Sequence, residues 1–310
     1  MLTSMASDLT PVYADGPWTH REVSANGARF HVAEVGDGPL ALFLHGFPQF
    51  WWTWRDQLTA FAEAGYRAVA MDLRGIGGSD KPPRGYDPLT ATMDVTGVIR
   101  ALGESNAVLI GHGWGAGLAW TAATMRPKAV RRLVIVGAAH PRQMRTALLT
   151  SPAQIAASKH IFAAQRPLQA ERGLVKDHGA AVARMLDAWS GPNWPEPEVA
   201  RRYQDAMLIP GVAHSTMEYY RWQIRSLMRP DGLRYHQRMR ALTEVPTLHL
   251  HGALDTVVLD STARGSGGQV NAPYRWRLLE GLGHFPQEEA PKLFTGEVLG
   301  WLKDEEPDRY

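Results

Sequence analysis

The segment LIGHGWGAGLAW, residues 109–120, has the pattern of a strand, a sharp turn and a helix. Its apolar start ends at Ile110, and three glycines follow within the next five residues. A turn of the form glycine–x–nucleophile–x–glycine exposes one side chain that attacks a substrate. Gly111 and Gly115 occupy the outer positions, and Gly113 stands where the nucleophile would be. The segment therefore predicts a nucleophile turn without a nucleophile.

Asp255 and His284 are candidates for the acid and the base that accompany such a turn. Asp255 lies three residues after Gly252, at the end of a predicted strand, and His284 follows a glycine turn after the next strand. The order turn, acid, histidine is the one that this kind of turn predicts. The acid would orient His284 and stabilise its protonated form.

His249 and His251 are predicted to lie on one face of a strand, where a metal pair is conceivable. The spacing of the sequence offers no third ligand, which a metal site would need. We therefore predict structural packing for both histidines and no metal site.

Alternating strands and helices must position these residues. An alternating pattern predicts a strand at 28–35, and apolar runs predict strands at 40–46, 66–75, 107–111, 130–139, 245–252 and 274–281. Segments with helical spacing or composition lie at 55–65, 87–104, 116–127 and 292–306, and Asp87 and Pro88 are typical of a helix start. Such alternation predicts an α/β fold with a parallel sheet covered on both faces.

The alternation stops between residues 141 and 240. This stretch contains helical segments and proline clusters such as SGPNWPEPE, but no convincing strand. We therefore predict a core made of residues 1–140 and 241–310, with residues 141–240 inserted as a helical lid. The lid would cover the carboxyl ends of the strands, which is where ligands bind in open α/β sheets.

The composition narrows the class of protein. The 310 residues are 45% hydrophobic with a formal charge of +2, which suits one large domain with an insertion. The basic residues are scattered, so no nucleic-acid partner is expected. The absence of cysteine excludes disulfides, thiolate metal sites and a cysteine nucleophile. Residues 1–20 lack the features of a signal peptide, and no apolar run could span a membrane. We expect a cytoplasmic protein without membrane insertion. The sequence is compatible with a monomer or a homodimer.

Six segments resemble the α/β-hydrolases of the epoxide hydrolase and haloalkane dehalogenase branch, above all the actinobacterial epoxide hydrolase E group. They are HGFPQFWWTW (45–54), DLRGIGGSDKPPRGYD (72–87), GHGWGA (111–116), YYRW (219–222), HLHGALD (249–255) and GLGHFPQEEAP (281–291). They occur in the family's order and span nearly the whole chain. The resemblance implies an α/β-hydrolase fold, with a mostly parallel central sheet flanked by helices and an inserted helical lid.

The resemblance also assigns roles to single residues. The backbone N–H groups of Phe47 and Trp114 would form the oxyanion hole, which depends on position and not on side-chain type. Tyr220 matches one of two lid tyrosines that hydrogen-bond an epoxide oxygen, and His160 stands at the position of the other. A neutral or charged histidine could donate there, although a partly exposed helix residue is an equally good interpretation. The pocket is expected to include Trp51, His45 and His112, together with Trp52, Trp54 and Trp222 as aromatic neighbours. No cofactor is implied.

Gly113 departs from the family pattern. There an aspartate attacks the substrate carbon, and a histidine-activated water hydrolyses the resulting alkyl ester. Glycine cannot perform that step, and three explanations stay open. The chain is an engineered knock-out, a silent relative that binds an apolar small molecule or a partner under its lid, or a hydrolase with another mechanism. In the last case a water activated by His284 and Asp255 attacks an epoxide or carbonyl directly. The retained acid and base favour the third explanation, a hydrolase with another mechanism. Dehalogenation is least favoured, because it also needs the missing carboxylate.

Overall fold

The computed structural model of the chain describes residues 9–304. Residues 1–8 and 305–310 lie outside the described residues. The predicted core extends into both segments, and the N-terminal stretch expected to lack a signal peptide begins in the first.

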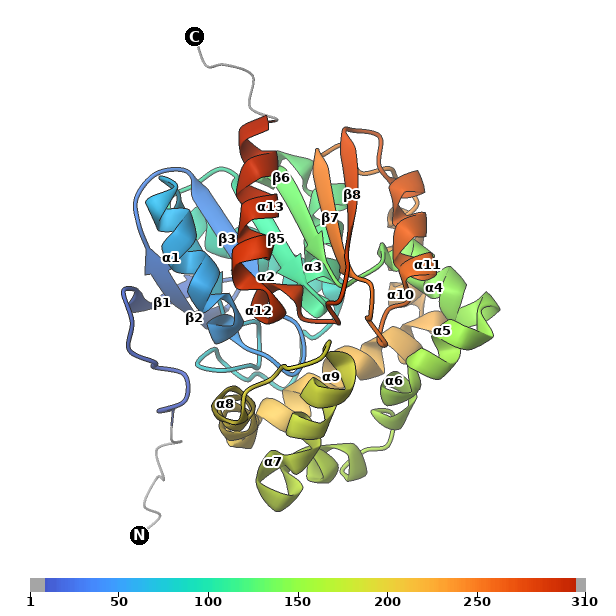
Figure 1. The fold of residues 1–310 in the computed structure, drawn as a ribbon. Helices are drawn as coiled ribbons and strands as arrows, with labels where there is room; N and C mark the ends of the chain where they lie inside the picture. The colour runs from blue at the N-terminus through green and yellow to red at the C-terminus, as the bar shows by residue number, and fades with distance from the viewer. Residues whose placement is uncertain (1–8, 305–310) are drawn as a thin grey trace.

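Eight strands form one sheet in the order β1-β2-β4-β3-β5-β6-β7-β8 (Figure 1). Strands β4, β3, β5, β6, β7 and β8 run parallel, whereas β2 pairs antiparallel with β1 and β4. The bounds are β1 Thr19–Ala25, β2 Ala28–Val35, β3 Leu40–Leu44, β4 Arg67–Met71, β5 Ala107–His112, β6 Val130–Val136, β7 Thr247–Gly252 and β8 Tyr274–Leu279. The mostly parallel sheet confirms the predicted fold class.

Helices cover both faces of the sheet, with α1 and α13 on one side and α2 and α3 on the other (Figure 1). Every residue of β3, β5 and β7 is buried between them. These helices are α1 Arg55–Glu63, α2 Pro88–Ala101, α3 Trp114–Met125 and α13 Pro291–Asp304. As predicted, α2 begins at Pro88, and the Asp87 side chain accepts a hydrogen bond from the Thr90 backbone N–H at 2.9 Å.

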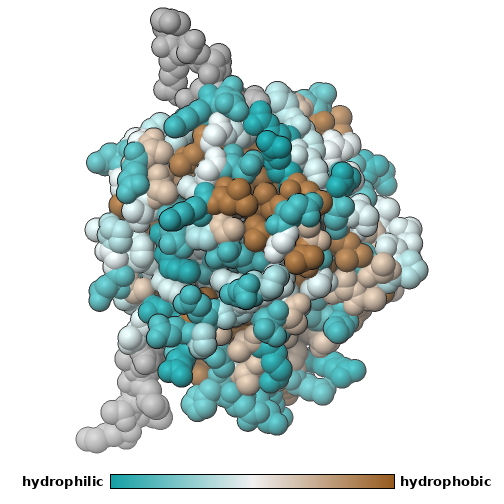
Figure 2. Space-filling model, in the orientation of Figure 1, coloured by the Kyte–Doolittle hydropathy of each residue, from teal (hydrophilic) through white to brown (hydrophobic). Residues whose placement is uncertain are grey.

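Short helical segments complete the core. They are η1 Trp51–Trp54, η2 Pro127–Ala129, α11 Asp260–Arg264, η4 Gly265–Gln269 and α12 Pro286–Glu289. Hydrophilic residues predominate on the face drawn in Figure 2, with hydrophobic residues in smaller groups among them. Within residues 9–304, no helix combines the length and the apolar character that crossing a membrane requires.

Between β6 and β7 the chain forms a series of helices and adds no strand to the sheet. They are α4 Pro141–Thr150, α5 Pro152–Ala157, α6 Lys159–Ala163, α7 Gln169–Trp189, α8 Pro197–Leu208, α9 Val212–Arg225, η3 Ser226–Met228 and α10 Pro230–Arg238. Most of this segment lies beyond the edge of the sheet where the parallel strands end (Figure 1). We call it the helical segment.

A buried carboxylate joins the helical segment to the core. Glu288 of α12 accepts hydrogen bonds from the Tyr203 hydroxyl of α8 at 2.7 Å and from the Thr53 hydroxyl at 3.0 Å. Its other oxygen accepts from the Arg55 guanidinium. Burial raises the pKa of Glu288, although Arg55 opposes that shift. These contacts fix α8 against the sheet.

The pattern of apolar residues did not predict β1. Only Val23 of its seven residues is buried, and the rest are charged, polar or small. The strand is held by its antiparallel ladder with β2, from Thr19 opposite Glu34 to Ala25 opposite Ala28. Backbone pairing at a sheet edge leaves little hydrophobic pattern, which explains the omission.

The start of α3 packs against the end of β3 without space for side chains. A Cβ at Gly115 would overlap the carbonyl oxygen of Leu44, and one at Gly111 would overlap the carbonyl of Gly115. The Gly115 N–H also donates to the His45 carbonyl at 3.1 Å. Both outer glycines of the turn are therefore required by close backbone approach.

We predict that Gly115→Ala lowers the free energy of unfolding by about 1–3 kcal/mol, because the methyl group forces α3 away from β3. Urea unfolding measures the change. Gly117→Ala on the same helix is the control, since a Cβ there meets nothing within 4 Å. The control should be neutral or stabilising by about 0.5–1 kcal/mol. Equal losses in both variants would contradict the packing argument.

Candidate active site

Gly113 lies at a sharp turn between β5 and α3. Its φ of 52° and ψ of −113° place it in a region that other residues rarely adopt. Its N–H donates to the Val136 carbonyl at 3.1 Å. A residue other than glycine would be strained there by about 1–3 kcal/mol. The strand–turn–helix geometry predicted from residues 109–120 is thus present.

The open side of Gly113 faces His284. A Cβ on Gly113 would lie 3.4 Å from the Cα of Gly46 and 3.8 Å from Nε2 of His284. Both distances are ordinary van der Waals contacts, so a side chain fits at position 113. It would point at the ring nitrogen of the histidine, as the sequence predicted.

His284 and Asp255 form a buried hydrogen-bonded pair. Nδ1 of His284 lies 2.8 Å from Oδ2 of Asp255, and Oδ1 of the aspartate accepts from the Val257 and Val258 N–H groups at 2.7 and 3.0 Å. Burial alone would raise the pKa of Asp255, but His284 and the other donors outweigh it and lower that pKa below 3.8. The ionised carboxylate orients the imidazole and leaves Nε2 free toward Gly113.

A cavity of about 360 Å³ opens over this pair. Gly113, His284, Phe47, Trp114, Tyr220 and His160 line it, as do Trp222 and several apolar side chains of α4. The aromatic rings touch one another: the Phe47 ring centre lies 5.4 Å from those of both Trp114 and Tyr220. Six of the predicted site residues other than Asp255 therefore line the same cavity.

Three residues expected in the pocket do not line this cavity. Trp51 is fully buried in the core, where its indole N–H donates to the Val12 carbonyl and its backbone N–H donates to Asp72, both at 2.8 Å. Trp52 and Trp54 share its short helix and are likewise absent from the lining. Trp51 and Trp54 are instead buried in the core, whereas Trp52 is half-buried beneath the guanidinium groups of Arg55 and Arg202.

His45 and His112, also expected in the pocket, lie beneath it. The ring of His45 bonds the Gly46 carbonyl at 2.9 Å and accepts from the Leu73 N–H at 3.0 Å. Burial lowers the pKa of His112 well below 6.5, so its neutral ring donates from Nε2 to the His284 carbonyl at 2.8 Å. Both histidines hold the backbone around the site and do not reach the cavity.

Tyr220 of α9 and His160 of α6 lie side by side in the lining of the cavity. Their ring centres are 5.2 Å apart. Burial raises the pKa of Tyr220 well above 10.0, so the hydroxyl keeps its proton. Burial, followed by the nearby His284, lowers the pKa of His160 to about 4. His160 is therefore a neutral imidazole near pH 7, which can donate an N–H but is not a charged acid.

Phe47 and Trp114, whose backbone N–H groups are expected to form the oxyanion hole, both line the cavity. Gly46, which precedes Phe47, is the closest neighbour of the open face of Gly113, and Trp114 begins α3. Among the described residues, neither N–H donates a hydrogen bond to another group. Unpaired donors at a helix start can bind a partial negative charge.

Comparison with known proteins agrees with this geometry. A family model described as alpha/beta hydrolase fold matches residues 39–291. The chain belongs to this family. It is 33% identical over 304 residues to epoxide hydrolase 3 of Xenopus tropicalis, covering 94% of this chain and 79% of the relative. It is 28% identical to epoxide hydrolase A of Mycobacterium tuberculosis, covering 93% and 98% of the two chains.

Solved structures show the same similarity. Epoxide hydrolase A from Mycobacterium thermoresistibile matches with a TM-score of 0.81 and 25% identity, over 94% of this chain and all of that one. The Bacillus megaterium epoxide hydrolase in complex with an inhibitor matches with a TM-score of 0.81 and 26% identity, over 91% of this chain and all of that one. The protein is an epoxide hydrolase-like α/β-hydrolase.

Two aromatic residues of this α/β-hydrolase site were not predicted. Tyr219 stacks on Trp114 at 4.9 Å and donates to the Arg74 carbonyl at 3.0 Å. Trp189, at the end of α7, accepts from the His284 N–H at 2.7 Å through its carbonyl. Tyr219 stands in the YYRW motif and could have been noticed, but the contact of Trp189 depends on the path of the helical segment.

The strand histidines of the α/β-hydrolase core have protein partners. His251 Nε2 lies 2.8 Å from the Val258 carbonyl, and His249 Nδ1 lies 2.9 Å from the Tyr274 hydroxyl. The described part of the chain contains no cluster of three or more His, Cys, Asp or Glu side chains suited to a metal. The structural role predicted for both histidines matches these contacts.

We predict that Gly113→Ala is folded but less stable, by about 1–3 kcal/mol, because alanine is strained at a φ of 52° even where space exists. Thermal and urea unfolding measure the loss. Ala116→Gly on α3 is the control for general helix effects and should cost about 1 kcal/mol by propensity alone. An unchanged or raised stability of Gly113→Ala would show that the turn relaxes.

Stability should fall as the pH is lowered from neutral. Burial lowers the pKa of His140 to about 3 and those of His160 and His236 to about 4, from 6.5. Below about pH 6.5 the unfolded chain binds protons that the folded protein does not, so the free energy of unfolding decreases down to about pH 4. Urea titrations across this range measure the slope.

His160→Gln should make that slope shallower, since one group of depressed pKa is removed. His214→Gln is the control, because its side chain is 55% exposed. A steeper or unchanged slope for His160→Gln would contradict the assignment.

Proposed function

We propose that this chain hydrolyses an epoxide, or a carbonyl compound of similar size, by direct attack of water. The observation that carries the proposal is the free Nε2 of a buried, aspartate-bonded histidine that faces a side-chain position left open by glycine. The space beside Gly113 can hold the attacking water where a carboxylate would otherwise stand.

His284 would act as the general base. Its Nδ1 is occupied by Asp255, so Nε2 takes a proton from the water while the water oxygen bonds to the substrate carbon. The ionised Asp255 stabilises the imidazolium that forms. No ester with the protein arises at any stage, because Gly113 has no group to form one.

Tyr220 and His160 would receive the epoxide oxygen. As the carbon–oxygen bond of the ring breaks, the oxygen takes a proton from the Tyr220 hydroxyl and becomes the second hydroxyl of a diol. His160 donates a further hydrogen bond from its neutral ring. The proton held by His284 returns to Tyr220 through solvent, so one water is added in all. For an ester, the N–H groups of Phe47 and Trp114 would stabilise the oxyanion instead, and the leaving alcohol oxygen would take the proton from His284 as its bond to the carbonyl carbon breaks.

The base, the acid and the backbone donors that remain could by themselves accelerate the reaction appreciably. Enzymes of the triad type that lose their nucleophile keep roughly 10³–10⁴-fold acceleration over water from the remaining site. The aromatic lining favours an apolar substrate, and the helical segment would serve as its lid. A silent relative that only binds such a molecule has the same cavity, so the test must separate turnover from binding.

The test uses the native chain, Gly113→Asp, His284→Ala and the double variant, each with aryl epoxides and simple aryl esters. We expect native turnover that falls at least about a hundredfold in His284→Ala, because the base is lost. With enzyme in excess and oxygen-labelled water, the native chain should place the label in the diol in the first turnover. Gly113→Asp should instead transfer an unlabelled carboxylate oxygen in that turnover.

Native turnover that survives His284→Ala would refute the base. If only Gly113→Asp reacts while the native chain is stabilised by the same compounds, the native role is binding. Inactivity of the native chain toward both classes would overturn the proposed chemistry.

A further inference from the structure

The far end of the cavity holds several buried polar atoms that have no partner. Nε of Arg145 and both ring nitrogens of His236 are buried without a hydrogen bond. The same is true of Nε1 of Trp222 and Oε1 of Gln223. All four residues line the cavity that also contains Gly113 and His284. Unsatisfied buried polar groups are costly, and each calls for an explanation such as a water or an ion that binds there.

The charge at this end is uncompensated. Within residues 9–304, Arg145 forms no ion pair and no hydrogen bond. It is also the charged neighbour that, after burial, lowers the pKa of His236 to about 4. A guanidinium beside a neutral imidazole and an indole N–H presents donors without an anion. An apolar cavity with unpaired hydrogen-bond donors at one end suits an apolar ligand that carries a hydrogen-bond acceptor at one of its own ends.

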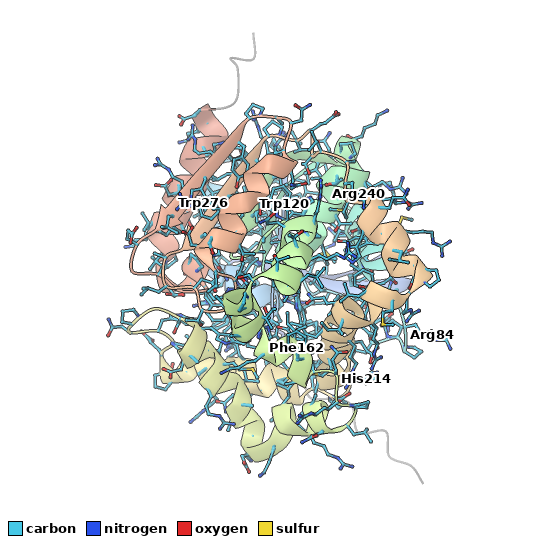
Figure 3. The ribbon with its side chains drawn as sticks, turned by 90° about the vertical axis from the view of Figure 1, so that its right-hand side faces the viewer. Arg84, Trp120, Phe162, His214, Arg240 and Trp276 are labelled. Atoms are coloured by element: carbon cyan, nitrogen blue, oxygen red, sulfur yellow. The ribbon has the colours of Figure 1, made fainter. Side chains whose placement is uncertain are left out.

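The two ends of the cavity lie along α3. Gly113 precedes the helix, Gly117 and Leu118 line the cavity, and the Thr121 hydroxyl lies 3.0 Å from that of Tyr235, next to His236. Eight residues of helix span roughly 12 Å between the two ends. Figure 3 views this end of the molecule, with α4 near the centre between α10 and α11 and Phe162 below it.

From this arrangement we infer that the cavity takes an elongated apolar molecule with a carboxylate at one end, which Arg145 and His236 bind. The guanidinium can meet both carboxylate oxygens through parallel N–H donors, and the planar fork suits this geometry better than a single donor. His236 donates from its neutral ring, and the indole N–H of Trp222 is a further donor. The apolar chain then extends along α3 toward Gly113.

The inference rests on the proposed function, because it names the substrate class of that same site. The carboxylate would anchor the molecule and present the opposite, reactive part to His284. The substrates would be medium-chain epoxy acids, and the corresponding neutral esters or alcohols would bind less well.

Calorimetry with decanoate, decanol and methyl decanoate tests the anchor without any turnover. We expect the native chain to bind decanoate at least about tenfold more tightly than decanol, since hydrogen bonds to charged groups contribute strongly. Arg145→Gln should weaken the binding of decanoate by about ten- to a hundredfold. The affinity for decanol should change by less than about twofold. Arg145→Lys should recover part of the preference, because the charge is kept.

Arg142→Gln is the matched control. Arg142 lies on the same helix one turn earlier, is exposed, and bonds Gln269 at the surface. It should leave the decanoate preference unchanged. Equal binding of decanoate and decanol, binding of neither, or an equal loss in Arg142→Gln would overturn the inference. Circular dichroism and melting temperature confirm that each variant is folded.

The two proposals fail separately. A decanoate preference that depends on Arg145, in a chain without hydrolase activity, upholds the carboxylate anchor and refutes the direct-water reaction. Turnover of aryl epoxides with equal binding of decanoate and decanol refutes the anchor alone.

Discussion

The close approach of α3 to the end of β3 is the constraint on which the site depends. Gly115 allows the backbones of α3 and β3 to touch, Gly111 leaves room for the start of α3 beside β5, and Gly113 adopts the positive φ that reverses the chain between them. This contact sets the direction in which position 113 points. It also places Gly46 and the N–H of Phe47 beside the start of α3. Without the contact between α3 and β3, position 113 and the backbone donors would not lie next to His284.

Burial controls the electrostatics around that centre. Asp255 stays ionised because its oxygens accept several hydrogen bonds, whereas His112 and His160 stay neutral because charge is costly in an apolar environment. The histidines consequently differ in role: His284 faces the cavity, His112 holds the backbone, and His160 offers an N–H. The same residue type serves three purposes because its surroundings differ.

The helical segment converts an open sheet edge into a cavity of defined chemistry. Tyr220 and His160 come from α9 and α6, while Arg145 and His236 come from α4 and α10. The hydrogen bond from Tyr203 to Glu288 holds α8 against the core. The cavity therefore combines Gly113 and His284 of the core with polar side chains of the helical segment.

The sequence by itself determined the fold class, the turn at Gly113 and the pairing of Asp255 with His284. Glycines at close contacts and continuous apolar strands impose these features locally, so they are visible in the order of residues. Only the tertiary structure decided that Trp51, His45 and His112 lie outside the cavity, since a side chain's direction depends on what packs around it. The edge strand β1 and the cluster of Arg145 and His236 were also invisible beforehand. The first is held by backbone pairing, and the second joins residues far apart in the chain.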